Sequence, residues 1–175
     1  MQPSYTPNAF AFDLLALFSD VPWVHVTEAR KECLMSASPM TYTYGQGRGV
    51  RTYTSTPLTP VVEAIQAKLN ADGFAYNVCF LNRYDDQHQR LGWHADDSPG
   101  MLHEHPIAVV SFGAERDIWW KRRDIEGPVV LRQRLSAGSL FVMPPGFQRE
   151  YQHRIPKSDR PCGIRISLTF RRYIA

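Results

Sequence analysis

Cysteine is scarce in this sequence, and long apolar runs are absent. The three cysteines (Cys33, Cys79 and Cys162) are widely spaced and form no CxxC or CxxH pair, so neither a zinc ribbon nor a disulfide framework is indicated. The N-terminal apolar stretch contains Asp13 and follows no basic residue, so it makes a poor signal peptide. No apolar segment is long enough to span a bilayer. We therefore expect a soluble, unexported cytoplasmic protein with reduced thiols and no membrane partner.

The sequence also lacks internal repeats, low-complexity tracts and linkers. Its 175 residues suffice for one domain with a real core, and its 43% hydrophobic and 21% charged fractions are ordinary for a globular protein. The net charge of +3 permits an anionic partner without requiring one. We expect a single domain over residues 1–175 that is a monomer.

Helical spacing is confined to the N-terminal part of the chain. Residues 8–19 carry apolar side chains at helical intervals, with Asn8 as the cap. A second helix is predicted to begin at Pro60, capped by Thr59, and to end at Gly73. Both helices are expected to pack on the core.

Residues 40–54 (MTYTYGQGRGVRTYT) have a different pattern. Two runs of alternating Thr and Tyr flank a glycine-rich turn, which predicts a β-hairpin. Its tyrosines, interleaved with Arg48 and Arg51, suit stacking on bases and pairing with phosphates. An ordinary two-stranded ribbon would show the same pattern.

From Tyr76 onward the apolar residues recur at every second position. This period predicts strands, which we place at residues 76–84, 107–113, 117–122, 128–135, 139–144 and 164–172. No helical segment separates the later strands, which is typical of an antiparallel sandwich or barrel. We expect an α+β, mainly β fold: N-terminal helices and a hairpin in residues 1–75, then a jelly-roll core in residues 76–175.

His94 and Asp96 form a candidate metal-binding pair. On an extended segment residues two apart point to the same face. With a second histidine they make the two-His-one-carboxylate set typical of non-heme Fe(II). His153 is the best candidate, because it follows the strand at 139–144 and precedes the last strand, whereas the other histidines fall in the N-terminal region, in turns or in loops.

The last strand and the strand at 76–84 each carry a polar face. Arg165, Ser167, Thr169 and Arg171 share one face without any acid, which suits an enclosed dianion. A half-exposed strand with its cations in solvent would show the same alternation. Asn82 and Tyr84 likewise point together.

The order NRY, WHADD, SFGAERD, a late His and RISLTFR resembles the AlkB family of Fe(II)- and 2-oxoglutarate-dependent dioxygenases, in its nucleic-acid dealkylase branch. The similarity runs from about Tyr42 to Arg172. It implies a double-stranded β-helix (jelly-roll) core with a nucleotide-recognition hairpin, and Fe(II), 2-oxoglutarate and O2 as cofactors. It also implies that the catalytic residues binding Fe(II) are His94, Asp96 and His153.

The resemblance implies further roles. Arg165 and Tyr84 would bind the far carboxylate of 2-oxoglutarate, and Arg171 and Asn82 would lie near its metal-chelating end. Ser167 stands where the family usually has Asn, and its hydroxyl can still donate a hydrogen bond.

The implied activity is oxidative demethylation of 1-methyladenine or 3-methylcytosine in DNA or RNA, releasing formaldehyde, succinate and CO2. The implied substrate-binding residues are Tyr42, Tyr44, Arg48, Arg51, Trp93, Asp97 and Ser98. Ser98 stands where family members commonly have a carboxylate. Residues 121–123 (KRR) are a candidate phosphate contact, or equally a solvated turn.

Three alternatives stay open. Ser98 is consistent with a hydroxylase that acts on a protein side chain or on a free or modified nucleobase. A non-catalytic nucleic-acid-binding module would make the HxD pair incidental. A zinc hydrolase could use the same three ligands, but it would leave Arg165 and Arg171 unexplained.

Overall fold

The computed structural model describes residues 2–12, 14–44, 50–125, 127 and 130–174. The helices are α1 (Leu14–Ser19), α2 (Pro60–Ala71) and α3 (Phe147–Glu150). The strands are β1 (Ser4–Thr6), β2 (Val24–Thr27), β3 (Arg30–Ser36), β4 (Thr41–Tyr44), β5 (Arg51–Thr54), β6 (Val78–Tyr84), β7 (Leu91–His94), β8 (Ile107–Gly113), β9 (Arg116–Arg122), β10 (Leu131–Leu135), β11 (Ser139–Met143), β12 (Tyr151–Ile155) and β13 (Arg165–Arg171).

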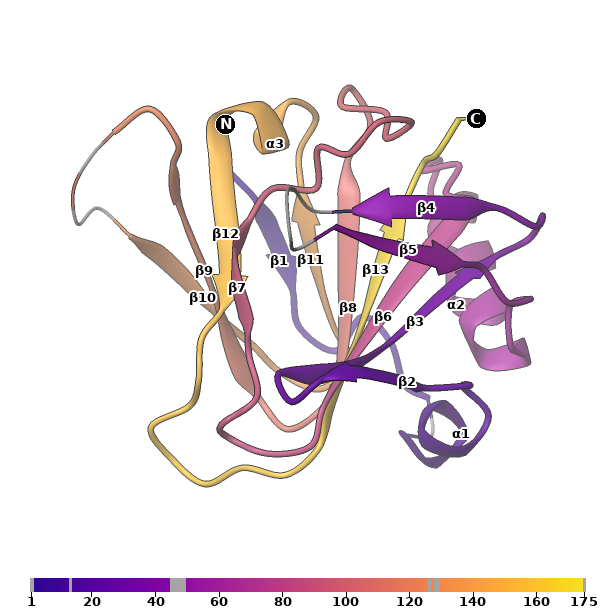
Figure 1. The fold of residues 1–175 in the computed structure, drawn as a ribbon, viewed down its shortest axis with the longest axis horizontal. Coiled ribbons are helices and arrows are strands. Elements are labelled where there is room, and N and C mark those ends of the chain that lie inside the picture. The colour runs from indigo at the N-terminus through magenta and orange to yellow at the C-terminus, as the bar shows by residue number, and fades with distance from the viewer. Residues whose placement is uncertain (1, 13, 45–49, 126, 128–129, 175) are drawn as a thin grey trace.

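Two antiparallel sheets face each other. Within the described residues, the major sheet has the strand order β1-β11-β8-β13-β6-β3-β2 and the minor sheet the order β10-β9-β12-β7. Strands β4 and β5 form a separate hairpin. Figure 1 shows the minor sheet on one side of the major sheet and helices α1 and α2 on the other. The predicted jelly-roll core is confirmed.

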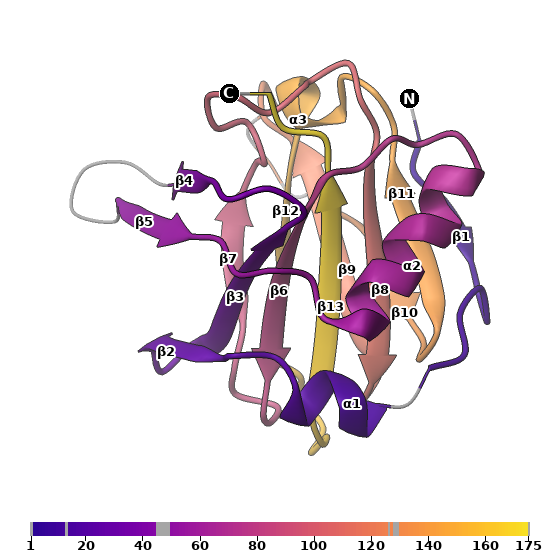
Figure 2. The ribbon, with the colours of Figure 1, turned by 90° about the vertical axis from the view of Figure 1, so that its right-hand side faces the viewer.

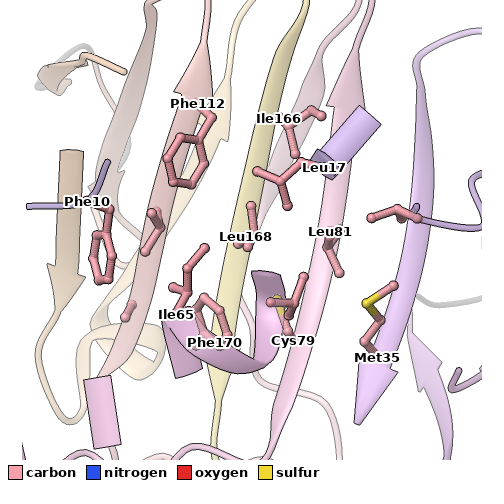
Figure 3. Packing of buried hydrophobic residues seen from close by; sticks show 14 of the residues in the cluster. Phe10, Leu17, Met35, Ile65, Cys79, Leu81, Phe112, Ile166, Leu168 and Phe170 are labelled. Carbon is pink, nitrogen blue, oxygen red and sulfur yellow. The ribbon is translucent and has the colours of Figure 1, made fainter. Parts of the chain in front are cut away.

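The outer face of the major sheet carries the main apolar core. Ile166, Leu168 and Phe170 alternate along β13 and are fully buried against side chains such as Leu17 of α1 and Ile65 of α2 (Figure 3). Figure 2 shows both helices lying across this face. Each such side chain stabilises the fold by about 1.5–3 kcal/mol on burial.

The inner face of the same strands is polar and equally buried. In the registered strands β6, β13 and β8, Asn82, Ser167 and Ser111 lie side by side. Every residue of β13 is buried, which excludes the interpretation that its arginines face solvent. The alternation in β13 therefore separates an apolar helix-facing side from a polar interior side.

The strand predictions agree closely with the structure in the C-terminal part. Strand β8 has the predicted bounds, β9 and β11 differ from them by one residue at one end, and β13 differs by one residue at each end. The N-terminal part was predicted less well, because β1, β2 and β3 also join the major sheet. The sequence of β3, RKECLMS, shows no alternation because five of its residues are buried.

The predicted helix at residues 8–19 is wrong in its first half. Helix α1 begins at Leu14, and Asn8 has a positive φ of 53° instead of capping a helix. The N–H of Phe10 donates to the carbonyl of Gly138 at 2.9 Å, so this segment is bound to the turn between β10 and β11. Tertiary hydrogen bonding outweighs the local helical pattern.

Helix α2 begins at Pro60 as predicted, although Thr59 makes no side-chain cap hydrogen bond. Among the described residues, no helix combines the length and the hydropathy needed to cross a membrane.

Candidate metal and cosubstrate site

Two histidines from different strands meet in the minor sheet. His94 at the end of β7 pairs in register with His153 of β12, and their ring centroids lie 4.2 Å apart. Asp96 follows two residues after His94 and is 2% exposed. The candidate ligand atoms of all three residues lie within 4.8 Å of one another. The minor sheet thus brings together the three predicted ligands.

The orientation of the rings suits metal binding. Nδ1 of His94 lies 2.9 Å from the carbonyl oxygen of Gly92, which leaves Nε2 facing Asp96, 3.7 Å from Oδ1. Nε2 of His153 lies 3.8 Å from the other carboxylate oxygen, Oδ2. Hydrogen bonding of one ring nitrogen to a backbone carbonyl is the usual way in which a metal-binding histidine is held.

The loop after β7 is held by a buried glutamine. The N–H of Asp96 donates to Oε1 of Gln148 in α3 at 3.0 Å, and the backbone carbonyl of Gln148 accepts from Arg123 at 2.9 Å. Both contacts position the carboxylate beside the histidine pair. Sequence reasoning missed Gln148, whose only local signal is its place after a Pro-Pro-Gly turn.

The electrostatics favour the protonation states that a metal requires. Burial lowers the pKa of both histidines, that of His153 to about 3. Burial by itself raises the pKa of Asp96, but Arg171 and the histidines outweigh it, so the net shift is downward. Neutral imidazoles and an ionised carboxylate are the forms that bind a divalent cation.

The residues present fit Fe(II). Nη2 of Arg171 donates to Oδ1 of Asp96 at 2.6 Å, whereas Oδ2 is buried without a hydrogen-bond partner in the described part of the chain. A buried carboxylate oxygen without a partner is costly, and a cation would satisfy it. Two imidazoles and one carboxylate are the ligand set of non-heme Fe(II) sites.

A narrow pocket with about 20 Å³ of internal space adjoins His94 and Asp96. It is lined by Arg30, Tyr42, Phe80, Asn82, Leu91, His94, Asp96 and Arg171. Nε of Arg30 donates to Oδ1 of Asn82 at 2.7 Å, and its Nη2 pairs with the buried carboxylate of Glu32. Arg30 was not predicted, and its sequence context carries no signal.

Arg165 lies on the same interior face, at the other end of β13. It is fully buried and donates from Nη2 to Oγ of Ser111 at 3.0 Å. Its Nε and Nη1 atoms and the hydroxyl of Tyr84 have no hydrogen-bond partners among the described residues. Burial lowers the pKa of Arg165 to about 10, which leaves it a cation at neutral pH. A buried guanidinium with unused donors suits a carboxylate.

Arg116, also missed by the sequence analysis, is 2% exposed beside the Tyr84 ring. It donates to the backbone carbonyls of Asp86 and Gln89 at 3.2 and 2.8 Å, and also to that of Pro156. These contacts hold two loops together. Its sequence signal is its position in SFGAERD.

The predicted base-stacking residue Tyr42 lies inside the site. It is 2% exposed, and its hydroxyl donates to Oγ of Ser98 at 3.1 Å and accepts from Nη1 of Arg171 at 3.5 Å. Burial raises its pKa, so the phenol keeps its proton. The structure therefore presents the hydroxyl, more than the ring face, to the pocket.

A wider groove of about 640 Å³ opens on the other side of His94. It is lined by Thr41, Thr43, Trp93, His94, Ala95, Asp97, Ser98, Pro99, Arg123, Gln152 and Tyr173. The predicted substrate residues Trp93, Asp97 and Ser98 therefore lie together, and Asp97 pairs with Arg123 at 2.7 Å.

Of the other predicted substrate residues that the structure describes, Tyr42 and Arg51 do not line this groove. Arg51 lies 3.5 Å from the buried carboxylate of Glu32, so part of its charge is already paired. Arg48 and the side chain of Tyr44 lie outside the described residues.

Residues 19–171 match the sequence pattern of the 2OG-Fe(II) oxygenase superfamily. The chain belongs to this superfamily. Its relatives include the mouse protein "DNA oxidative demethylase ALKBH2", 33% identical over 83% of this chain and 62% of that protein. The human "Alpha-ketoglutarate-dependent dioxygenase alkB homolog 3" is 28% identical over 89% of this chain and 58% of that protein. The AlkB-like resemblance is confirmed, and the family implies Fe(II), 2-oxoglutarate and O2 as cofactors.

The chain therefore spans about three fifths of the length of these curated 2OG-Fe(II) oxygenase relatives. A solved structure, "The structure of OsALKBH1", is similar to it with a TM-score of 0.55 at 17% identity, covering 88% of this chain and 81% of that one. This similarity supports the jelly-roll fold.

Proposed function

We propose that this protein is an Fe(II)- and 2-oxoglutarate-dependent oxidative demethylase that acts on N-alkylated bases, such as 1-methyladenine and 3-methylcytosine, in DNA or RNA. The observation that carries the proposal is the cluster of His94, Asp96 and His153, in which His94 lines both an arginine-lined pocket and a wide groove. The relative named a DNA oxidative demethylase supports the substrate class.

In this proposal His94, Asp96 and His153 hold Fe(II) as the catalytic residues. The bound metal, with 2-oxoglutarate and O2, supplies an oxidant strong enough to hydroxylate a methyl group, which no amino-acid side chain can do. Arg171 keeps the carboxylate of Asp96 ionised and directs its second oxygen toward the histidines. Gln148 holds the backbone of Asp96 in place.

The cosubstrate occupies the interior face of β13 and β6. Arg165 binds the far carboxylate bidentately, and the free hydroxyl of Tyr84 donates a further hydrogen bond. Asn82 and Arg171 bind the end nearest the metal, with Ser167 in the row between β6 and β8. Burial excludes water from these contacts and strengthens them.

The alkylated base enters by the groove on the far side of His94. Trp93 offers an indole wall, and strand β4 of the hairpin contributes Thr41 and Thr43 to the lining. A base inside a duplex must leave the stack to reach this site. Arg48, Arg51 and, in the basic segment at residues 121–123, Lys121 are the proposed phosphate contacts.

One observation favours a second candidate with the same chemistry. Ser98 is buried and accepts the hydrogen bond of Tyr42, so a neutral hydroxyl occupies the place where a carboxylate would meet a cationic base. A neutral modified or free nucleobase, or a protein side chain, is the corresponding substrate.

The test measures succinate and formaldehyde from iron-loaded protein with DNA and RNA oligonucleotides that carry a panel of single methylated bases. The proposal expects both products in equal amounts from at least one oligonucleotide. Complete absence of 2-oxoglutarate turnover with every oligonucleotide would refute it. Free methylated nucleobases are assayed in parallel. Turnover with a free nucleobase, and with none of the oligonucleotides, would support the second candidate.

A further inference from the structure

The outer face of the minor sheet carries a row of alternating aromatic and cationic side chains. Pairing of β10 with β9 places Arg132 opposite Trp119, and pairing of β12 with β9 places Arg154 opposite Trp119. Trp93 of β7 lies next to Arg154 on the same face. The row reads Trp93, Arg154, Trp119, Arg132 across the minor sheet, about 14 Å at the usual strand spacing.

The guanidinium of Arg154 is stacked between two indoles. Its central carbon lies 4.7 Å from the ring centroid of Trp93 and 4.5 Å from that of Trp119. Nζ of Lys121 lies 5.1 Å from the Trp93 ring. An arginine stacked in this way is held in one orientation while its fork of N–H donors stays charged.

These cations are not neutralised by the protein. The acid on this face, Asp117, is paired with Arg134 at 2.6 Å. Among the described residues, no carboxylate lies within ion-pair distance of Lys121, Arg132 or Arg154. In contrast, the neighbouring Arg122 and Arg123 pair with Asp124 and Asp97. The row therefore has an unbalanced positive charge.

The row is open and adjoins the substrate groove. Trp93 and Gln152 belong both to this face and to the groove lining. Figure 1 shows helices α1 and α2 on the opposite side of the molecule, so they do not cover this face. Since β7 is the edge strand of the described minor sheet, a chain bound in the groove at His94 can continue around this edge onto the outer face.

We propose that this row binds the single-stranded nucleic-acid segment next to the base held in the groove, with bases on the indoles and phosphates on Lys121, Arg132 and Arg154. The assignment rests on the function proposed above. Indole faces with unpaired cations are the features by which proteins bind single strands without reading sequence.

The test is fluorescence anisotropy of an unmodified single-stranded oligonucleotide with the full chain at several salt concentrations. The triple variant Lys121→Gln/Arg132→Gln/Arg154→Gln is compared with wild type. Loss of three phosphate contacts lowers the slope of log K against log salt by about 2, and weakens binding about 100-fold at 0.1 M salt. Thermal unfolding of the triple variant verifies that it is folded.

The matched control is Lys68→Gln on α2, an exposed lysine on the far side of the major sheet, compared with Lys121→Gln alone. The proposal expects a lower salt slope only for Lys121→Gln. A Trp119→Leu variant tests stacking, with an expected loss of about 10-fold.

The binding assay needs no turnover, so its outcome is separate from that of the demethylase assay. Equal salt slopes for wild type and a folded triple variant would overturn the assignment of this face, even if the enzyme demethylates oligonucleotides. A lower salt slope in the triple variant, without any turnover by wild type, would support nucleic-acid binding by this face and refute the proposed demethylase activity. The same variant is also titrated with an acidic peptide. If the triple variant lost binding to this peptide while its oligonucleotide binding stayed unchanged, the assignment would be overturned in favour of a protein partner.

Discussion

His94 and His153 are direct cross-strand partners in the minor sheet, with ring centroids 4.2 Å apart, although four further strands of the described chain, β8 to β11, lie between them in the sequence. Strand pairing constrains the separation of these two side chains, since the register determines the positions of both Cβ atoms. The third candidate ligand, Asp96, needs only a two-residue extension of β7. The candidate metal site is therefore positioned by strand pairing, which is rigid, and by one short loop.

Replacing His153 with Ala is expected to abolish specific Fe(II) binding, because two ligands cannot hold the ion that three hold. Metal at one hundred times its dissociation constant should stabilise the wild-type protein by about 2.7 kcal/mol and so raise its unfolding temperature. This stabilisation should vanish in the variant. Calorimetric titration and thermal unfolding measure both effects. His88→Ala, in an exposed turn, is the control; equal metal binding by His153→Ala and wild type would remove the site from consideration.

Arg165→Gln should raise the KM for 2-oxoglutarate and leave the affinity for Fe(II) unchanged. The lost charge-assisted hydrogen bonds correspond to about 1.5–3 kcal/mol, or roughly 10- to 150-fold in KM. Succinate release at varied 2-oxoglutarate concentration measures this KM. Arg172→Gln is the matched control, because Arg172 follows β13 and contacts the backbone carbonyl of Ala75. An unchanged KM in Arg165→Gln would show that the far carboxylate of 2-oxoglutarate does not bind Arg165.

Tyr53→Phe is expected to destabilise the protein by about 1.5–3 kcal/mol. The Tyr53 hydroxyl donates to Oε2 of the buried Glu32 at 2.8 Å and connects the hairpin strand β5 to β3. Burial and Glu32 raise the pKa of Tyr53 to about 12, so the hydroxyl keeps its proton across the whole working range. Urea unfolding of the variant measures the loss.

Tyr76→Phe is the matched control for Tyr53→Phe. The hydroxyl of Tyr76 is buried without a partner among the described residues, so its removal should be neutral or slightly stabilising. If both variants lost the same stability, the hydrogen bond to Glu32 would contribute nothing beyond the packing of the ring.

Gly113→Ala should destabilise the fold by about 1–3 kcal/mol and weaken 2-oxoglutarate binding in the protein that remains folded. Gly113 has a φ of +80°, and a Cβ there would lie 2.2 Å from the carbonyl oxygen of Ile164. It also pairs with Arg165 in the sheet, so a shift would displace the arginine. Thermal unfolding and 2-oxoglutarate titration measure the two effects. Gly163→Ala, where a Cβ meets no atom within 4 Å, should be near neutral.

Much of the jelly roll and the identity of the candidate ligands could be predicted from the sequence. Strand β8 was predicted with its exact bounds, because a run of apolar residues between turn residues is a local signal. The alternation of β13 likewise separates a polar from an apolar face without reference to any neighbour. The chemistry of HxD and of two arginines on one face is a property of residue types and spacing.

Other features depend on contacts between distant segments. Strand β3 was missed since both its faces are covered, by the helices on one side and the hairpin on the other, which removes the alternation. The helix predicted from Asn8 was cut short because Phe10 bonds to Gly138, far along the chain. Arg30 and Gln148 acquire their places in the site from Asn82 and Asp96, and no local pattern marks them.

The sequence by itself determined which residue types carry the chemistry: an HxD pair, a late histidine and an arginine strand without acids. Only the tertiary structure decided that these arginines face a buried interior, that His153 meets His94, and that Tyr42 offers its hydroxyl to Arg171 and Ser98. The physical reason is that periodicity reports how one segment is oriented, whereas burial and pairing depend on which other segment covers it.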